Sequence, residues 1–202
     1  MNKKTAVTKK ILYTIGFPDC YDFKQSIISA KLLKLETKHI KLNENKLCKN
    51  LEEYNILTND TDKVSISFTL PFFILLKKIP EKNIISGHGA DTLFGGFYKY
   101  LKIENLKYEI QDNYDKFLYN LANREYRIAK YFNKKLILPF ADKKIGNYIL
   151  SLPEELFIKD NIRKYLLRKV AKEFGLPSDI IKLPKKAFQY SSGIMNKLRK
   201  IW

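Results

Sequence analysis

A glycine-rich turn holds the side chains of this sequence that are best suited to bind a ligand. Residues 86–91 read S-G-H-G-A-D, between an apolar run that predicts a strand and a segment that predicts a helix. Glycines at such a junction let the backbone approach a ligand, and unpaired amides at a helix start favour an anion. Ligands of open parallel sheets bind at the carboxyl ends of the strands, where this turn is expected.

The carboxylate of Asp91, at the end of this turn, has two interpretations. It is suited to be the N-cap of the following helix, a purely structural role. A carboxylate beside a phosphate-binding turn is also a hard oxygen ligand of the kind that magnesium prefers. Far along the chain, Lys185 and Lys186 form a basic pair that, taken alone, indicates a solvated surface.

The turn needs a sheet to hold it, and the first hundred residues predict one. Strands are expected over Lys10–Phe17 and Lys38–Leu42, and a helix capped by Asp22 and ending near Leu35 connects them in a β-α-β unit. A third strand over 83–86 leads into the turn, and a helix should start at Asp91. The core face of the first helix is expected at Phe23, Ile27, Ala30 and Leu33.

Helices account for the remaining segments of the prediction. Asn43 or Asn45 starts one helix, and a largely buried helix ends at Pro80. Beyond Leu101 the pattern is helical almost throughout, with one apolar face formed by Tyr114, Phe117, Leu118, Leu121, Ile128 and Tyr131, and further helices over 144–150, 162–174 and 192–199. We therefore expect an α/β part over residues 1–102 and a helical part over residues 103–202.

Five segments, in order along the chain, resemble the synthase domain of asparagine synthetases. Residues 86–97, S-G-H-G-A-D-T-L-F-G-G-F, resemble the family signature S-G-E-G-A-D-E-L-F-G-G-Y. Residues 13–17 resemble its second strand, and residues 138–142 resemble its R-x-P-F-L-D segment. Residues 151–153 and 163–168 correspond to S-L-P and K-x-x-L-R, and residues 183–194 are similar to the lysine-bearing segment of the archaeal asparagine synthase-like branch.

The resemblance implies a parallel sheet of the adenine nucleotide alpha-hydrolase (PP-loop) type and an ATP-dependent ligase. Such a domain adenylates a carboxylate, aspartate in asparagine synthetases, and lets ammonia attack the acyl-adenylate. The family's motifs place the nucleotide near Ile15, Ser86, Gly87 and Gly89, and magnesium at Asp91. They place a pyrophosphate-stabilising lysine at Lys185, where a cation meets charge that develops in the transition state.

The family's phosphate-gripping loop, S-G-G-x-D-S, does not occur in these 202 residues. By resemblance, the strand before that loop lies in the middle of the sheet, beside the strands at Ile11 and Ile84. We expect a partner polypeptide to supply this strand and loop, with or without a glutaminase domain, by strand addition. The chain alone is then expected to be inactive. The alternative is a degenerate relative without ATP chemistry, which acts as a binding or scaffold subunit.

Other positions also depart from the family pattern. His88 stands where the family has the glutamate assigned acid–base work on the attacking nitrogen. Histidine moves protons near neutral pH but supplies no negative charge, so a catalytic histidine and a simple turn residue both remain open. Thr92 replaces a second acidic residue, and Lys135 and Ile137 stand where the family has Glu and Arg, consistent with a discarded ion pair.

Composition excludes several classes of protein. The chain has 38 basic and 21 acidic residues, a net charge of +17 and 45% hydrophobic residues, which predicts one soluble globular domain. Its two cysteines, Cys20 and Cys48, lack the spacing of a disulfide framework or a zinc site. The longest apolar run, Val64–Leu76, is shorter than the roughly 20 residues of a membrane span. A cytoplasmic location without a membrane partner is therefore expected.

The positive charge comes almost entirely from lysine, because the chain has only five arginines. Readers of nucleic acid tend to use the bidentate arginine side chain, and here lysines are spread over the whole sequence. This pattern favours a solvated lysine-rich surface over a nucleic-acid face. RNA binding within a modification complex remains an alternative, which strong salt-dependent retention on RNA would support.

Overall fold

The structure is a computed structural model that describes residues 10–201. Its contacts group the chain into two compact units, which we describe separately. Unit 1 takes in the described residues of Met1–Glu53, Thr61–Leu75 and Lys186–Trp202, and unit 2 takes in Tyr54–Asp60 and Leu76–Lys185. The division into an α/β part and a helical part at residue 102 stays a prediction.

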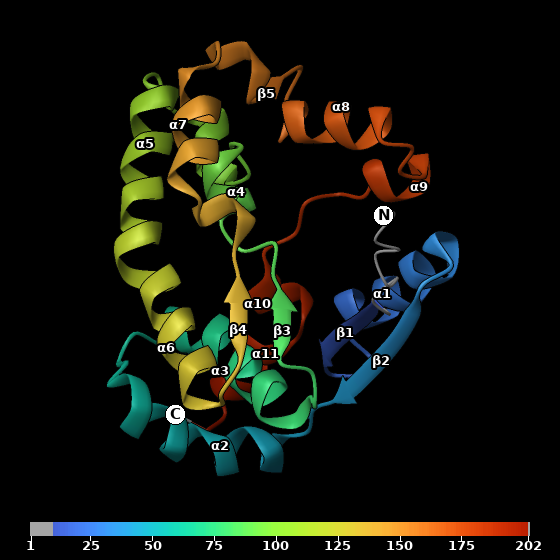
Figure 1. The fold of residues 1–202 in the computed structure, drawn as a ribbon, viewed down its shortest axis with the longest axis vertical. Helices are drawn as coiled ribbons and strands as arrows, with labels where there is room; N and C mark the ends of the chain where they lie inside the picture. The colour runs from blue at the N-terminus through green and yellow to red at the C-terminus, as the bar shows by residue number, and fades with distance from the viewer. Residues whose placement is uncertain (1–9, 202) are drawn as a thin grey trace, which may run out of the picture. The chain divides into compact units, whose positions relative to one another are not determined.

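Unit 1 contains the predicted β-α-β motif. Strands β1 (Ile11–Gly16) and β2 (Glu36–Lys41) pair in parallel, from Ile11 opposite Glu36 to Gly16 opposite Lys41. Helix α1 (Tyr21–Leu33) connects them (Figure 1). It ends where Lys34 takes a left-handed conformation with φ 52°. The three predicted elements are confirmed, with their ends shifted by a few residues.

Two details of α1 differ from the prediction. Asp22 is not its N-cap, because a turn from Phe17 to Cys20 starts the helix earlier and the Cys20 Sγ accepts the amide of Phe23 at 3.4 Å. Asp22 lies in the first turn instead. Ile27 is not in the core, since its side chain is 48% exposed while Phe23 and Ala30 are buried. A sheet of two strands is too narrow to cover the whole predicted face.

Two helices run from unit 1 into unit 2. Helix α2 (Glu44–Thr58) begins after Asn43, whose side chain accepts the amide of Lys46, as predicted for one of two asparagines. Helix α3 (Lys63–Lys78) is the largely buried helix expected before Pro80. Unit 1 also contains α11 (Ile194–Leu198), which lies within the helix predicted over 192–199, and α10 (Phe188–Ser191), which was not predicted. Gly193, with φ 75°, separates the two.

Unit 2 contains a second parallel pair. Strand β3 (Asn83–Ile85) pairs with β4 (Lys135–Ile137), from Asn83 opposite Lys135 to Ile85 opposite Ile137 (Figure 1). Helix α4 (Ala90–Leu93) follows the glycine turn. The prediction of helix almost throughout beyond Leu101 was wrong at β4, because a three-residue strand is too short to show a periodicity of its own.

One continuous helical rod runs through residues 106–131 of unit 2. Helix α5 (Leu106–Lys116), a π-helical segment (Phe117–Ala122) and α6 (Asn123–Tyr131) follow without a break (Figure 1). Tyr114, Phe117 and Ile128 are buried as predicted, but Tyr131 is 54% exposed. A π-helix takes more residues per turn than an α-helix, so the α-helical spacing behind the prediction no longer places Tyr131 on the buried face.

A hairpin stands before the last long helix of unit 2. Strands β5 (Ile158–Lys159) and β6 (Ile162–Arg163) pair antiparallel across Asp160 and Asn161, which both have positive φ, as a tight two-residue hairpin requires. The helix predicted from residue 162 therefore starts later. The remaining helices are α7 (Lys143–Ser151), α8 (Tyr165–Glu173) and α9 (Ser178–Ile181).

The described elements make a mixed α/β protein, as predicted at the level of fold class. The strands of residues 10–201 form three two-stranded sheets, of which two are parallel. A single sheet of the PP-loop type stays a prediction. None of the helices in this part of the chain has the length and apolar character needed to cross a membrane.

Candidate functional site

The glycine turn of unit 2 connects β3 to α4, and its glycines play different roles. Gly89 has φ 91°, and a Cβ built on it would lie 2.7 Å from the ring of Phe117. The fold therefore requires glycine there. Nothing lies within 4 Å of a Cβ built on Gly87, so the backbone at Gly87 is open to a ligand. The hydroxyl of Ser86 accepts the amide of His88 at 3.3 Å and so shapes the turn.

Asp91 contacts two lysines from distant parts of unit 2. Its Oδ1 lies 2.6 Å from the Nζ of Lys164, and its Oδ2 lies 3.2 Å from the Nζ of Lys185. Burial on its own would raise the pKa of Asp91, but the charges of Lys164 and then Lys185 outweigh it and lower that pKa. The N-cap of α4 is Gly89, so of the two interpretations of Asp91 the capping one is wrong.

Lys164 is a residue of this cluster that sequence reasoning did not single out. It directly precedes α8 in a left-handed conformation with φ 57°, just after the β5–β6 hairpin. A Cβ on Gly96 would lie 2.5 Å from the Oδ1 of Asp91 and 2.8 Å from the Cε of Lys164, so Gly96 makes room for the pair. The signal in the sequence was the match of residues 163–168 to K-x-x-L-R.

Two arginines hold the segment that carries Lys185. Arg163 donates to the backbone carbonyls of Gly96 at 2.9 Å and Lys185 at 3.1 Å. Arg168 donates to the carbonyls of Arg163, Ile181 and Leu183. Because both side chains bind main-chain oxygens, they fix the path of the chain up to Lys185. They are positioning residues for the lysine cluster.

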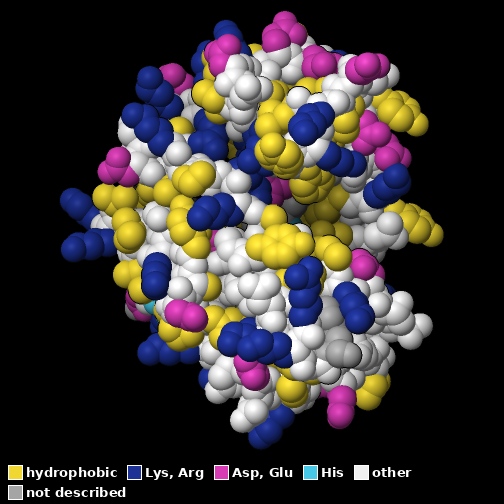
Figure 2. Space-filling model, turned by 180° about the vertical axis from the view of Figure 1, so that it is seen from behind, with side chains coloured by type: hydrophobic (Ala, Val, Ile, Leu, Met, Phe, Trp, Pro, Cys, Tyr) yellow, Lys and Arg dark blue, Asp and Glu magenta, His cyan; other side chains and the backbone are white. Residues whose placement is uncertain are grey.

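A cavity of about 500 Å³ opens beside this segment. Six basic side chains and no acidic one line it, and the basic residues are Arg163, Arg168, Lys169, Lys172, Lys182 and Lys185. A cavity of this composition suits an anion. On the face shown in Figure 2, lysines and arginines are interspersed with acidic, hydrophobic and other side chains.

His88 has a carboxylate partner within unit 2. Its Nδ1 contacts the Oε1 of Glu125, a residue of α6 whose side chain is fully buried. Burial on its own would lower the pKa of His88, but the hydrogen bond and charge of Glu125, with a smaller effect of Asp91, raise it. Sequence reasoning did not find Glu125, because no spacing rule connects residues 88 and 125.

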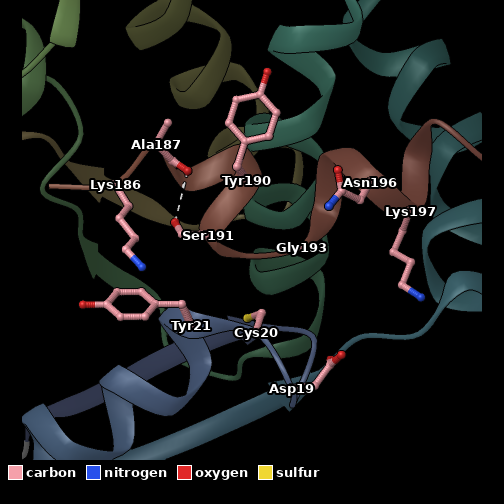
Figure 3. A pocket seen from close by; sticks show the side chains of 10 residues that line it. All are labelled: Asp19, Cys20, Tyr21, Lys186, Ala187, Tyr190, Ser191, Gly193, Asn196 and Lys197. Atoms are coloured by element: carbon pink, nitrogen blue, oxygen red, sulfur yellow. Dashed lines mark hydrogen bonds between the residues drawn. The ribbon is translucent and has the colours of Figure 1, made fainter. Parts of the chain in front are cut away.

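Unit 1 contains a second cavity, of about 560 Å³, at the carboxyl end of β1. Its lining comes from the loop after β1 and from the segment of α10 and α11 (Figure 3). The ammonium of Lys186 lies 3.7 Å from the centre of the Tyr21 ring, and Ser191 donates to Asp22 at 2.6 Å. Its size is typical of small-molecule sites. Ile15 lies in β1 of this unit, and its part in nucleotide binding stays a prediction.

The described residues supply one carboxylate, rather than a cluster, for magnesium at the glycine turn. No group of three or more His, Cys, Asp or Glu side chains among residues 10–201 is arranged to hold a metal ion. Magnesium is often held by one or two protein carboxylates together with phosphate oxygens. Both oxygens of Asp91 contact lysines here, so its role as a magnesium ligand stays a prediction.

Comparisons with known proteins agree with the motifs. The asparagine synthase family model matches residues 2–138 and 106–201. The glutamine-hydrolysing asparagine synthetase of Gallus gallus is 32% identical over 76% of this chain and 27% of its own length. The enzyme of the same name from Rattus norvegicus is 27% identical over 90% of this chain and 34% of its own length. A Methanocaldococcus jannaschii protein, provisionally named a glutamine-hydrolysing asparagine synthetase, is 26% identical over 91% of this chain and 41% of its own length.

The chain spans less than half the length of each of these relatives. The family match nevertheless runs through segments of both units, including the glycine turn and the segment that carries Lys185. Because it extends over most of the sequence, we conclude that this chain belongs to the asparagine synthase family.

Proposed function

We propose that this chain forms the pyrophosphate end of a site for ATP-dependent amidation of a carboxylate. The observation that carries the proposal is the contact of Asp91 with Lys164 and Lys185 beside an open glycine turn. Two ammonium groups placed together meet the charge that builds up on a departing pyrophosphate and lower the barrier to its release. Asp91 holds both lysines in place until the anion arrives.

The proposed site gives the other residues of the turn distinct roles. The open backbone at Gly87, with Ser86 beside it, would approach the nucleotide, while Gly89 sets the path of the chain. Asp91 would hold magnesium together with the nucleotide phosphates. Magnesium bound there supplies positive charge that the leaving phosphates share with the lysines.

The acceptor that we propose is an aspartate-like carboxylate, with asparagine as the product. Its support is the name of the relatives, which are asparagine synthetases, together with the family match of this chain. A cytoplasmic location stays a prediction.

We further propose that a partner polypeptide supplies the missing strand and the S-G-G-x-D-S loop. Among residues 10–201, β1 pairs only with β2 and β3 pairs only with β4, so each has an unpaired edge. A strand edge without a partner can accept another strand. The partner would contribute the phosphate-binding amides and a second carboxylate that these 202 residues do not contain.

The experiment measures pyrophosphate release by the chain mixed with a polypeptide that carries the missing loop, in the presence of aspartate, ATP and magnesium. We expect Lys164→Ala and Lys185→Ala each to lower the rate at least 100-fold, because each removes a charge that is needed in the transition state. Lys116→Ala is the control, since Lys116 belongs to an exposed ion pair with Asp112 on α5. Equal rates for all three variants would remove the lysine cluster from the site.

The basic cavity beside α8 favours a second candidate function, which is binding of an RNA backbone. Retention on RNA should then fall steeply with salt, and it should fall further in Lys169→Ala and Lys172→Ala. The scaffold alternative predicts that neither the assembled nor the isolated chain binds magnesium–ATP. Nucleotide titration of both forms separates it from the ligase proposal.

A further inference from the structure

The contact between His88 and Glu125 joins the glycine turn of unit 2 to α6. The side chain of Glu125 is fully buried, whereas that of His88 is 39% exposed. The second oxygen of Glu125, Oε2, has no hydrogen-bond partner in the described structure. Burying a carboxylate is costly unless it is paired, so the contact with the imidazole is what makes this position tolerable for a glutamate.

The helical rod brings Glu125 to the turn. The ring of Phe117, at the start of the π-helical segment, packs so closely against Gly89 that no other residue fits there. Glu125 follows on the same rod, in the first turn of α6. Its neighbour Arg124 pairs with Asp60, a second buried carboxylate. The rod therefore fixes both the backbone and the imidazole of the turn, and π-helical segments of this kind are frequent at functional sites.

The charged groups that act on His88 come from two elements. Glu125 of α6 contacts the ring directly, and Asp91 of α4 acts on it through its charge. Glu125 binds at Nδ1, so the neutral ring carries its proton on Nδ1 and leaves Nε2 as the basic nitrogen. This arrangement of carboxylate, Nδ1 and basic Nε2 orients an imidazole for proton transfer.

The pair also supplies a negative charge that His88 alone cannot supply. The family signature that residues 86–97 resemble has glutamate where this chain has His88. A neutral imidazole together with the carboxylate of Glu125 carries one negative charge, the same as a single ionised glutamate. When the imidazole takes up a proton, the pair becomes neutral, as a protonated glutamate would be.

We propose that His88 and Glu125 form an acid–base couple in which His88 takes the proton of the attacking nitrogen and Glu125 is its positioning residue. This inference rests on the proposed amidation. Ammonia attacks the carbonyl carbon of the acyl-adenylate, the C–N bond forms, and the bond from carbon to the phosphate oxygen of AMP breaks. The electron pair leaves with AMP, and the proton released from nitrogen passes to Nε2 of His88.

A first test needs no enzymatic activity. The chain has only two histidines, so NMR follows the titration of both imidazoles in the intact chain, with His39 as an internal reference. We expect the pKa of His88 to fall in Glu125→Gln and to stay unchanged in Glu109→Gln, a matched control on α5. The signal of His39 should be the same in all three proteins. An unchanged pKa of His88 in Glu125→Gln would overturn the couple.

A second test separates the couple from the proposed function. In the complex with the missing loop, His88→Gln should lower amide formation about 100-fold or more, a loss much larger than any change in the release of pyrophosphate. The double variant His88→Glu with Glu125→Gln restores one carboxylate and should recover much of the loss, whereas Glu125→Gln alone should shift the pH profile of amide formation.

The outcomes of this second test are distinct. If the unaltered complex releases no pyrophosphate, the proposed function fails. If it releases pyrophosphate and His88→Gln forms amide at the normal rate, the proposed function stands and the couple fails. A loss in His88→Gln that the double variant does not recover would indicate a structural role of the ring, and that result would also overturn the couple.

Discussion

At the scale of single residues, Asp91 lies among opposite charges, and this makes its ionisation a measurable contribution to folding. Its pKa in the folded protein is lowered from the ordinary value of 3.8, with the lysine charges overcoming the effect of burial. A carboxyl group with a lower pKa in the folded state stabilises the fold when ionised. That contribution is complete above the ordinary pKa and is lost as the pH falls through the lowered value.

Asp91→Asn removes this contribution. We expect the variant to have a smaller free energy of unfolding than the unaltered chain above about pH 5, with the difference shrinking below pH 3.8. Urea unfolding at several pH values measures it. A difference that stays constant from pH 5 to pH 2 would contradict the charge argument.

The two glycines of the turn offer a matched pair of substitutions. Gly89→Ala forces a left-handed residue and a clash with Phe117, so we expect a loss of more than about 2 kcal/mol in the free energy of unfolding. Gly87→Ala meets open space and should unfold much like the unaltered chain. Thermal unfolding compares the two.

In the assembled complex, Gly87→Ala should nevertheless weaken nucleotide binding, because the added methyl group stands where the backbone is open. Normal nucleotide affinity in Gly87→Ala would mean that the ligand does not approach the chain there.

At the scale of elements, the buried ion pair of Asp60 and Arg124 links the loop after α2 to α6. Asp60 accepts from the hydroxyl of Tyr54 at 2.7 Å and pairs with Arg124, and its side chain is only 4% exposed. Removing one partner of such a pair leaves the other charge buried. We expect Asp60→Asn to lower the free energy of unfolding by roughly 3 kcal/mol. Asp112→Asn, which breaks an exposed pair on α5, is the control and should have little effect.

The sequence predicted the long, periodic elements and the short strand β3, but it missed β4 and the β5–β6 hairpin. The β-α-β motif of β1, α1 and β2 carries strong apolar patterns and a glycine at the end of its first strand. Strand β4 forms by pairing with β3, which is distant in the chain, and its three residues are too few to show an alternating pattern. The β5–β6 hairpin depends on two residues of positive φ, Asp160 and Asn161. Ile27 was misplaced because the width of a sheet is not visible in the pattern of one helix.

The same distinction applies to the candidate site. Asp91 and Lys185 were found from motifs, and the structure brings them together. Lys164 lay within a matched segment but depends on a left-handed backbone after a hairpin. Glu125 depends on the packing of the rod against the turn, which no local pattern encodes. Ile15 belongs to unit 1, and its role stays a prediction.

At the scale of the whole molecule, the two parallel strand pairs have unpaired edges among the described residues, 10–201. We expect a polypeptide that carries the missing strand and loop to slow amide hydrogen exchange in β1 and β3, because strand addition pairs backbone groups that have no second strand partner among the described residues. The β5–β6 hairpin serves as an internal control and should exchange at the same rate with and without the partner. Unchanged exchange in β1 and β3 would argue against strand addition.

The hydrogen bonds from Arg168 to main-chain oxygens affect how the segment before Lys185 can evolve. A guanidinium that holds carbonyl groups is indifferent to which side chains those residues carry. A change of side chain at Ile181 or Leu183 therefore leaves these two hydrogen bonds in place. Among relatives of this chain, we expect Arg168 to be kept even where the neighbouring residues differ.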